Sequence, residues 1–161
     1  MIRDARAGDV PDILAIWNPL IRDTAVTFTS EEKTSEGLGA LIAGRQAAGQ
    51  GVLVAEAEGA VAGFASYGTF RSGPGYAHTV EHTVILAPSA RHRGIGRELM
   101  LALETHARDA GHHAMIGGVS GENAAAIAFH RALGYRIVGT LPEVGRKFGR
   151  WLDLVLMQKL L

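Results

Sequence analysis

The chain contains no cysteine, which excludes disulfide bonds, thiolate metal sites and a cysteine acyl-enzyme. It also has no excess of charge, since 16 Lys and Arg residues balance 16 Asp and Glu residues. No overall field attracts it to nucleic acid or an anionic membrane, so any bound anion needs a local site. Aromatic residues make up 6% of the chain and are scattered, so no aromatic stripe is available for stacking bases.

Long apolar segments are missing as well. Three of the first six residues, Arg3, Asp4 and Arg6, are charged where a signal peptide would need an apolar core, and no uncharged apolar run approaches about 18 residues. We therefore expect a cytoplasmic protein with no nucleic-acid partner and no membrane contact. A length of 161 residues with 47% apolar side chains fits one compact domain over residues 1–161.

Apolar periodicity and turn residues predict the order β-α-α-β-β-β-α-β-α-β-β. Asp9 is expected to cap the first helix, which runs to about Arg22, and Thr34 or Ser35 the second, which ends near Gly49. The other helices are expected over 95–110 and 123–133, and the strands over 1–7, 52–57, 61–67, 78–86, 114–119, 135–140 and 152–158. A meander mixed with crossover helices indicates an α/β (α+β) fold with one mixed sheet and helices on both faces.

The most informative segment, 91–97, lies between an expected strand and an amphipathic helix and reads Arg-His-Arg-Gly-Ile-Gly-Arg. Its glycines let the backbone approach a ligand, and the free amides at the helix start favour phosphate. A dinucleotide fingerprint would need a third glycine where Leu99 stands, and a P-loop would need Gly-Lys-Ser/Thr. A diphosphate-bearing ligand and a simple tight turn remain the two interpretations.

Two motifs here resemble a known family. Arg91-x-x-Gly94-x-Gly96 matches the Arg/Gln-x-x-Gly-x-Gly/Ala acetyl-CoA signature of the GNAT superfamily. Asn123, opening a helix that ends His130-Arg-Ala-Leu-Gly-Tyr135, is similar to the second conserved block of that superfamily. The chain resembles most closely the phosphinothricin and methionine-sulfoximine N-acetyltransferase branch, over nearly its whole length, including segments 1–5, 79–84, 133–135 and 145–153.

The resemblance implies a GNAT fold with a mostly antiparallel sheet, acetyl-CoA as co-substrate and a homodimer. It implies that backbone amides of one strand and Asn123 contact the pantetheine arm, and that the glycine segment binds the diphosphate. The strand amides are those of Val84, Ile85 and Leu86. The residues of the glycine segment are Arg91, His92, Arg93, Gly94, Ile95, Gly96 and Arg97.

N-acetylation requires a base, because an ammonium group must lose a proton before it attacks a thioester. Glu81 lies in a β-rich run, where a buried carboxylate is costly without a partner. A salt-bridged structural glutamate is the alternative, and the resemblance favours a base acting directly or through water. His130 and Tyr135 are candidates for a general acid, with core packing as the alternative role, and the thiolate of coenzyme A is stable enough to leave without one.

The resemblance also implies the residues that recognise an amino-acid acceptor. Arg71 is suited to bidentate binding of a carboxylate, although an ordinary solvated arginine is equally compatible with its position. The other expected substrate residues are Phe28, Glu31, Tyr76, Lys147 and Arg150. No metal site is expected, because His78 and His82 share one strand face without a third ligand at suitable spacing.

The function expected from these residues is acetyl transfer to the α-amino group of a small amino acid or analogue: methionine sulfoximine, methionine sulfone or phosphinothricin. A non-catalytic coenzyme-A-binding sensor is one alternative. Acetylation of a protein or polyamine amine is another. A sensor would bind acetyl-CoA without the amine-dependent turnover that an acetyltransferase shows. An enzyme for a protein or polyamine would show turnover but would prefer that acceptor to a free amino acid.

Overall fold

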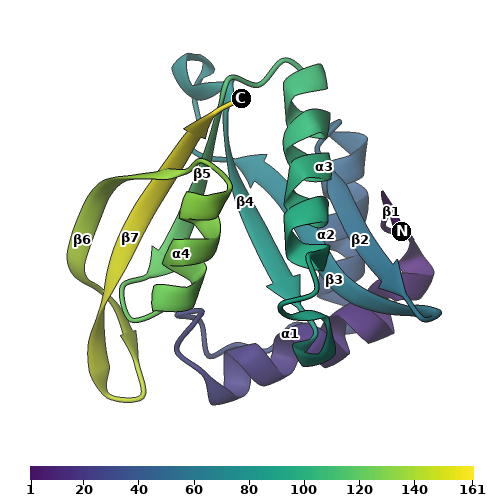
Figure 1. Ribbon diagram of the computed structural model, residues 1–161, viewed down its shortest axis with the longest axis horizontal. Coiled ribbons are helices and arrows are strands. Elements are labelled where there is room, and N and C mark those ends of the chain that lie inside the picture. The colour runs from purple at the N-terminus through teal and green to yellow at the C-terminus, as the bar shows by residue number, and fades with distance from the viewer.

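A computed structural model describes residues 1–161 and is built around a seven-stranded sheet with the order β1-β2-β3-β4-β5-β7-β6 (Figure 1). The strands are β1 (Ile2–Asp4), β2 (Val52–Ala57), β3 (Ala60–Thr69), β4 (Thr79–Leu86), β5 (Ala114–Ser120), β6 (Arg136–Lys147) and β7 (Arg150–Leu160). The α-helices are α1 (Val10–Asp23), α2 (Ser35–Ala47), α3 (Ile95–Asp109) and α4 (Ala124–Ala132). Short 3-10 helices cover Ala7–Asp9, Pro74–Tyr76 and Pro88–Ala90. The predicted order of elements is confirmed.

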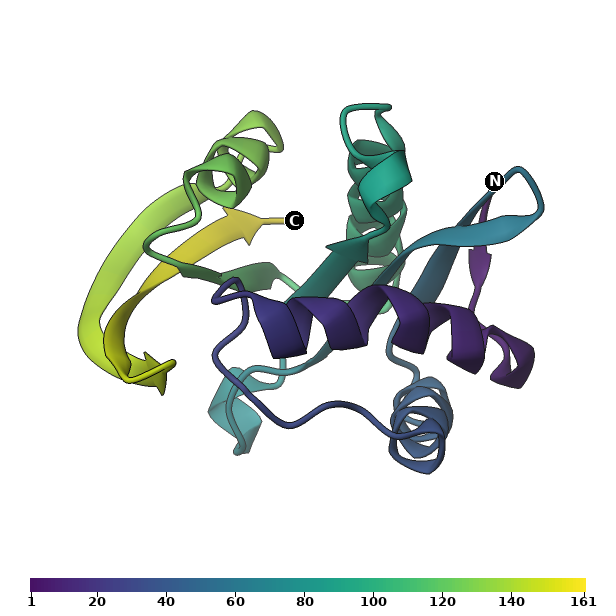
Figure 2. The same cartoon turned by 90° about the horizontal axis from the view of Figure 1, so that it is seen from below.

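Helices cover both faces of the sheet, with α1 and α2 on one side and α3 and α4 on the other (Figure 2). Each face has its own core, because alternate residues of a strand point to opposite faces. Ile13 of α1 and Leu38 of α2 pack with Phe64 of β3 on the first face. Leu103 of α3 and Met115 of β5 belong to the core of the second face. Both layers expected from the sequence are therefore present.

Strands β4 and β5 form the one parallel pair of the sheet and separate after a short stretch of pairing. Their register joins residues 79–81 to residues 114–116 and ends there, whereas β3 stays paired with β4 as far as Leu86. Figure 1 shows the two strands side by side at the start of β4 and apart at its end. We call this separation the β4–β5 gap. Alternation along β4 places Glu81 on the α1–α2 face and His82 on the α3–α4 face where the gap opens.

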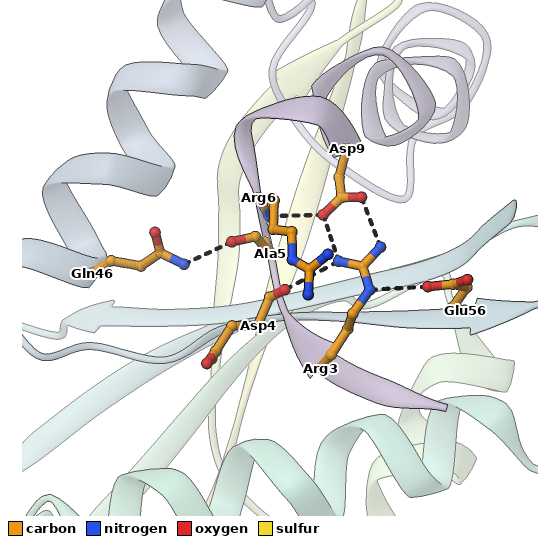
Figure 3. Close-up of polar contacts among 7 residues, drawn as sticks. All are labelled: Arg3, Asp4, Ala5, Arg6, Asp9, Gln46 and Glu56. Carbon is orange, nitrogen blue, oxygen red and sulfur yellow. Dashed lines mark hydrogen bonds and ion pairs between the residues drawn. The ribbon is translucent and has the colours of Figure 1, made fainter.

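The N-terminal segment is tied to both α1 and α2 (Figure 3). The guanidinium of Arg3 binds Asp9 at 2.8 and 2.9 Å and Glu56 at 2.9 Å. The expectation that the Asp9 side chain caps α1 is wrong, because its carboxylate accepts from the backbone N–H of Arg6 instead. Gln46, at the end of α2, donates to the carbonyl of Ala5 at 2.9 Å. The end of α2 is thereby fixed against the chain that follows β1.

Strand β6 is twice as long as the prediction of a strand over 135–140, since it runs to Lys147. Pro142 lies just beyond the predicted range, and proline cannot donate to a strand ladder. The register between β6 and β7 shifts between Leu141 and Gly145, so Pro142 lies in an irregular stretch of an edge strand where no ladder bond is required. The long β6–β7 hairpin that results forms one end of the sheet.

Candidate active site

The edge of β4 that borders the β4–β5 gap offers unpaired backbone groups. Ala87 N–H donates to the carbonyl of Ala62 at 2.9 Å, and the bonding direction alternates along a regular antiparallel ladder. The N–H of Ile85 consequently faces β3, whereas those of Val84 and Leu86 face the gap. Two of the three amides expected to bind pantetheine are therefore placed to do so, and the Ile85 amide is not.

The glycine segment forms the start of α3 beside the end of β4. Gly94 has a φ of 80° and no side chain to cap the helix, so the first amides of α3 are left without a side-chain partner. At Gly96 a Cβ atom would lie 2.8 Å from Leu86 Cδ1 and 3.3 Å from Phe129, so glycine allows this approach without displacing either side chain. An uncapped helix start of this kind suits phosphate, because its amides and dipole both attract an anion.

The remaining residues of this segment place positive charge around the helix start. Arg91 and His92 are exposed, and His92 holds a φ of 61°, a left-handed conformation uncommon outside glycine. Arg93 forms an exposed ion pair with Glu58, and Arg97 donates to the carbonyl of Ala132 at 3.5 Å. Both contacts are long or exposed, so they leave the guanidinium groups free to turn toward an anion.

Two further residues connect this segment to the rest of the site. Ile95 packs against the core beneath α3 and anchors the helix start. Asn123 caps α4, since its Oδ1 accepts from the backbone N–H of Ala126 at 3.0 Å. The remaining polar group of Asn123 is therefore an amide donor, which suits the carbonyls of a pantetheine arm.

Glu81 lies on the α1–α2 face and is exposed, so a substrate can reach its carboxylate. Partial desolvation raises the pKa of its carboxyl, and the positive charge of Arg45 on α2 acts in the opposite direction. Arg45 forms no ion pair with it within 4 Å, so the carboxylate is not neutralised in a salt bridge. The structure thus differs from the salt-bridged glutamate that the sequence left open.

On the opposite face, His82 and His130 form a buried pair. Their Nε2 atoms are 2.9 Å apart, and His130 Nδ1 lies 2.7 Å from the carbonyl of Ala126. Because a carbonyl only accepts, Nδ1 of His130 carries a proton, its Nε2 accepts, and Nε2 of His82 donates. A Cβ at Gly117 would lie 2.7 Å from the His82 ring, so the pair fills the space beside β5 where the gap opens.

Burial lowers the pKa of both histidines, and in His82 the neighbouring His130 lowers it further. Both rings are therefore neutral near pH 7. With both nitrogens of His130 engaged, a role as general acid is less favoured than a role in shaping the gap. Sequence reasoning considered His82 only as a metal ligand, although its alternation with Val80 and Val84 already placed it on the core face.

Tyr135 packs edge-on against the two histidines, with ring centroids 5.4 Å from His82 and 5.3 Å from His130. It is 2% exposed, and its hydroxyl has no hydrogen-bond partner in the protein. Burial and the nearby carboxylate of Glu104 raise the pKa of Tyr135, so the phenol stays protonated. This environment agrees better with packing than with proton donation.

The segment between α1 and α2 is held by Lys147 at the end of β6. The ammonium group of Lys147 donates to the carbonyls of Ile21, Thr24 and Thr27 at 2.6, 2.6 and 2.8 Å. All three of its donors are used, which argues against the expected contact between Lys147 and substrate. The same segment lays the ring of Phe28 over β6, where a Cβ at Gly145 would clash with it.

The other residues expected at the substrate site are exposed. Glu31 lies on the α1–α2 segment, and the guanidinium of Arg71 stacks on the ring of Tyr76, 5.6 Å from its centroid. Arg150 forms a two-contact ion pair with Glu122 at 2.5 and 3.2 Å, so its guanidinium is occupied. Arg71 and Tyr76 are thus brought together just before β4, whereas Arg150 supports the turn between β5 and α4.

These features define a site for an extended ligand that ends in phosphate. The ligand would lie between the separated strands β4 and β5, along the free amides of β4, with its phosphate at the uncapped start of α3. A reachable carboxylate at the opening of the gap adds a group that accepts protons. Together these features define an acyltransferase that draws on a coenzyme A thioester.

Comparison with known proteins agrees with this class. The model of the acetyltransferase (GNAT) family matches residues 17–135. The L-amino acid N-acyltransferase MnaT of Escherichia coli K12 is 41% identical over 157 residues, covering 98% of this chain and 91% of that protein. An L-methionine sulfoximine/L-methionine sulfone acetyltransferase of Pseudomonas paraeruginosa is 42% identical over 158 residues, covering 98% and 92%.

Solved structures give the same result. A ribosomal-protein-alanine N-acetyltransferase from Brucella melitensis superposes with a TM-score of 0.96 at 44% identity, covering 100% of this chain and 99% of that one. A putative acetyltransferase, yncA, from Salmonella typhimurium with its cofactor acetyl-CoA gives 0.95 at 39% identity, covering 99% and 92%. The chain belongs to the GNAT family of acetyltransferases.

The structure has neither a candidate metal cluster nor a helix suited to span a membrane. No cluster of three or more His, Asp or Glu side chains is arranged to hold a metal ion. None of the helices combines the length and apolar character needed to cross a membrane.

Proposed function

We propose that the chain transfers the acetyl group of acetyl-CoA to the α-amino group of a small amino acid or analogue, such as methionine sulfoximine, methionine sulfone or phosphinothricin. The observation that carries this proposal is the position of Glu81, exposed and unpaired at the opening of the β4–β5 gap. The E. coli and Pseudomonas relatives, whose names specify amino-acid acceptors over nearly the same length, support it.

In this proposal acetyl-CoA supplies the activated acetyl thioester. The amides of Val84 and Leu86 hold its pantetheine arm in the gap, and the start of α3 holds its diphosphate. Glu81 takes the proton of the acceptor ammonium, directly or through one water, so that the amine nitrogen can attack. An amide of β4 donates to the carbonyl oxygen as negative charge develops on it. The C–S bond of the tetrahedral intermediate then breaks and the sulfur departs as a thiolate, since both nitrogens of His130 are already engaged. The second proton of the attacking nitrogen passes to the thiolate or to solvent.

Acceptor recognition is assigned to the α1–α2 face. Phe28, Glu31, Arg71 and Tyr76 lie on segments of that face and are proposed to surround the side chain of the acceptor. Lys147 and Arg150 are proposed to contribute indirectly, by fixing the segments they contact.

A protein N-terminus is the second candidate acceptor, because the Brucella structure bears the name of a ribosomal-protein-alanine N-acetyltransferase. Both acceptors present an α-amino group, but a free amino acid also presents its own carboxylate. The two candidates therefore differ in whether the enzyme requires a free α-carboxylate on the acceptor.

We also propose a cytoplasmic homodimer formed from chains that each fold as one domain. The β6–β7 hairpin supports the dimer, since it exposes several large apolar side chains. These are Ile137, Val138, Leu141, Val144, Phe148, Trp151 and Leu160. Exposed apolar side chains gathered on one hairpin are typical of an interface between protein chains.

The experiment is release of coenzyme A thiol from acetyl-CoA with a panel of acceptors: methionine sulfoximine, methionine sulfone, phosphinothricin, methionine, a polyamine, and peptides with a free N-terminal alanine or a lysine. We expect turnover with the free amino acids at a kcat/KM at least tenfold above that of the peptides and the polyamine. Preference for a peptide or polyamine contradicts the amino-acid acceptor. Binding of acetyl-CoA without release of thiol for any acceptor indicates a sensor.

A further inference from the structure

One cation beside Glu81, Arg45, has been given no ligand in the site described above. Arg45 belongs to the last turn of α2, and its Nη1 donates to the hydroxyl of Ser66, a fully buried residue of β3. The rest of the guanidinium lies over Gly68, where a Cβ would come within 3.2 Å of Nη2 and 3.3 Å of Nε. Glycine at position 68 thus provides the space that the guanidinium occupies.

The strand register brings this guanidinium next to the base. Gly68 of β3 is the direct partner of Glu81 of β4, and paired residues project from the same face of a sheet. No acidic side chain lies within ion-pair distance of Arg45, and its Nε and Nη2 donate to no protein acceptor. Two donors of a planar cation are therefore available beside the carboxylate of Glu81.

Arg45 is also held firmly. Gln46, the next residue, donates to the carbonyl of Ala5, as Figure 3 shows, and the backbone N–H of Gln50 donates to the carbonyl of Arg45 at 2.9 Å. Burial lowers the pKa of Arg45, which means that its charge is partly removed from water without a carboxylate to compensate. Such an arrangement favours an anionic ligand group, because a carboxylate would satisfy both free donors.

We propose that Arg45 binds the α-carboxylate of the acceptor amino acid. In an α-amino acid the amino group and the carboxylate are attached to one carbon atom, so a base and a cation on neighbouring strand positions match both groups at once. Arg71, expected from the sequence to bind this carboxylate, lies beyond the end of β3, is exposed and stacks on Tyr76. Arg45 is the cation whose charge acts on Glu81. This inference rests on the proposed function and names the residue that selects a free amino acid.

The test compares two acceptors in three proteins. The acceptors are the preferred amino acid and its α-carboxamide, which keeps the amine and removes the negative charge. The proteins are the wild type, Arg45→Gln, and Arg108→Gln as a matched control, because Arg108 is an exposed last-turn arginine of α3 that forms no ion pair. Assays are run on the alkaline plateau, so that a change in the protonation of Glu81 does not enter the comparison.

We expect the carboxamide to lower kcat/KM at least tenfold in the wild type and in the control. In Arg45→Gln the kcat/KM of the amino acid should fall at least tenfold through a higher KM, while the KM of acetyl-CoA stays within twofold of the wild type. The amino acid and its carboxamide should then have equal kcat/KM values. Arg45→Lys should recover part of the preference, since it restores the charge without the planar fork.

Equal losses for both acceptors in Arg45→Gln would overturn the proposal, since Arg45 would then act on Glu81 or on the fold. If Arg45→Gln does not fold, two other variants decide. The proposal is overturned as well if Arg45→Lys keeps the full preference for the carboxylate and Arg71→Gln abolishes it. A wild type that acetylates no amino acid overturns the proposed function and the role of Arg45 together.

Discussion

Glu81 combines two properties that a general base needs. Its side chain is exposed, so an amine can reach it, and partial desolvation raises the pKa of its carboxyl. A raised pKa makes the carboxylate a stronger proton acceptor, and the charge of Arg45 limits how far the pKa rises. The balance between these two influences sets the pH below which the base is lost.

The pH dependence of kcat/KM should report this balance. Activity should fall as the pH drops through the pKa of Glu81, because a protonated carboxyl accepts no proton, and the midpoint should lie above the usual glutamate value of about 4.3. The measurement is a pH–rate profile for the wild type and Glu81→Gln. A fall in rate at low pH that persists in Glu81→Gln belongs to the acceptor amine. A midpoint at or below about 4.3 for the wild type contradicts a desolvated environment for Glu81.

The His82–His130 pair makes a separate prediction about stability. Burial lowers the pKa of both rings, so below about pH 6.5 the unfolded chain binds more protons than the folded protein. Stability should therefore be full above that pH and should fall as the pH drops. The measurement is urea unfolding at about pH 7 and about pH 5. Over this range the free energy of unfolding of the double variant His82→Gln/His130→Gln should fall by about 1–3 kcal/mol less than that of the wild type.

The matched control for the histidine pair is His113→Gln, because His113 is exposed. It should show the pH dependence of the wild type. An identical pH dependence in the double variant and the wild type would mean that the two rings are not held neutral by burial.

At the scale of elements, the segment between α1 and α2 depends on a strand more than 100 residues away. Lys147 reaches from β6 to one carbonyl at the end of α1 and two carbonyls of this segment, and the ring of Phe28 lies against Gly145 of the same strand. One wall of the proposed acceptor site is thereby fastened to the β6–β7 hairpin. Changes in the hairpin should consequently affect the acceptor more than acetyl-CoA.

Lys147→Met should destabilise the protein, because three carbonyls lose their donor at once. A buried group left without a partner costs about 1–3 kcal/mol, and we expect a total loss of at least about 2 kcal/mol in urea unfolding. Arg136→Met is the control on the same strand, since Arg136 is exposed and forms no ion pair. Equal losses of stability in the two variants would contradict a stabilising role for the contacts of Lys147 with the three carbonyls.

The sequence predicted the elements well where local patterns decide them. The alternation of helices and strands, the cap at Thr34 and the glycine segment before α3 follow from periodicity and turn residues. The length of β6 does not, because Pro142 is tolerated only through an irregular register with β7. The role of Lys147 was also out of reach, since it depends on a contact between distant segments.

The proposed site shows the same division. Glu81 and the glycine segment stand out in the sequence, because their residue types are unusual in a strand and at a helix start. Arg45 does not stand out, since an arginine in the last turn of a helix is usually solvated and favoured by the dipole. Only the β3–β4 register, which pairs Gly68 with Glu81, places it beside the base.

At the scale of the whole molecule, the hairpin that fastens the acceptor segment also carries seven of the eleven large apolar side chains that are exposed. Phe148 and Trp151 are 57% and 58% exposed. A second chain covering this face would remove them from water and would hold the hairpin, and with it the α1–α2 segment, in place. Dimer formation and acceptor binding should therefore depend on each other.

Trp151→Glu should convert the proposed dimer into a monomer, because a charge within an apolar interface is costly to bury. Sedimentation or light scattering gives the mass directly. Leu101→Glu serves as the control, since Leu101 is an exposed apolar residue of α3, away from the hairpin. A monomeric wild type, or a dimer that survives Trp151→Glu, would contradict an interface at this face.

The most direct test of the account is the effect of Glu81→Gln on coenzyme A thiol release with the preferred acceptor at saturating acetyl-CoA. We predict a loss of at least tenfold in kcat/KM, about 1.4 kcal/mol of barrier, with acetyl-CoA binding by calorimetry unchanged. Glu36→Gln, at an exposed position of α2, should match the wild type. Activity of Glu81→Gln within twofold of the wild type would contradict a catalytic base at this position.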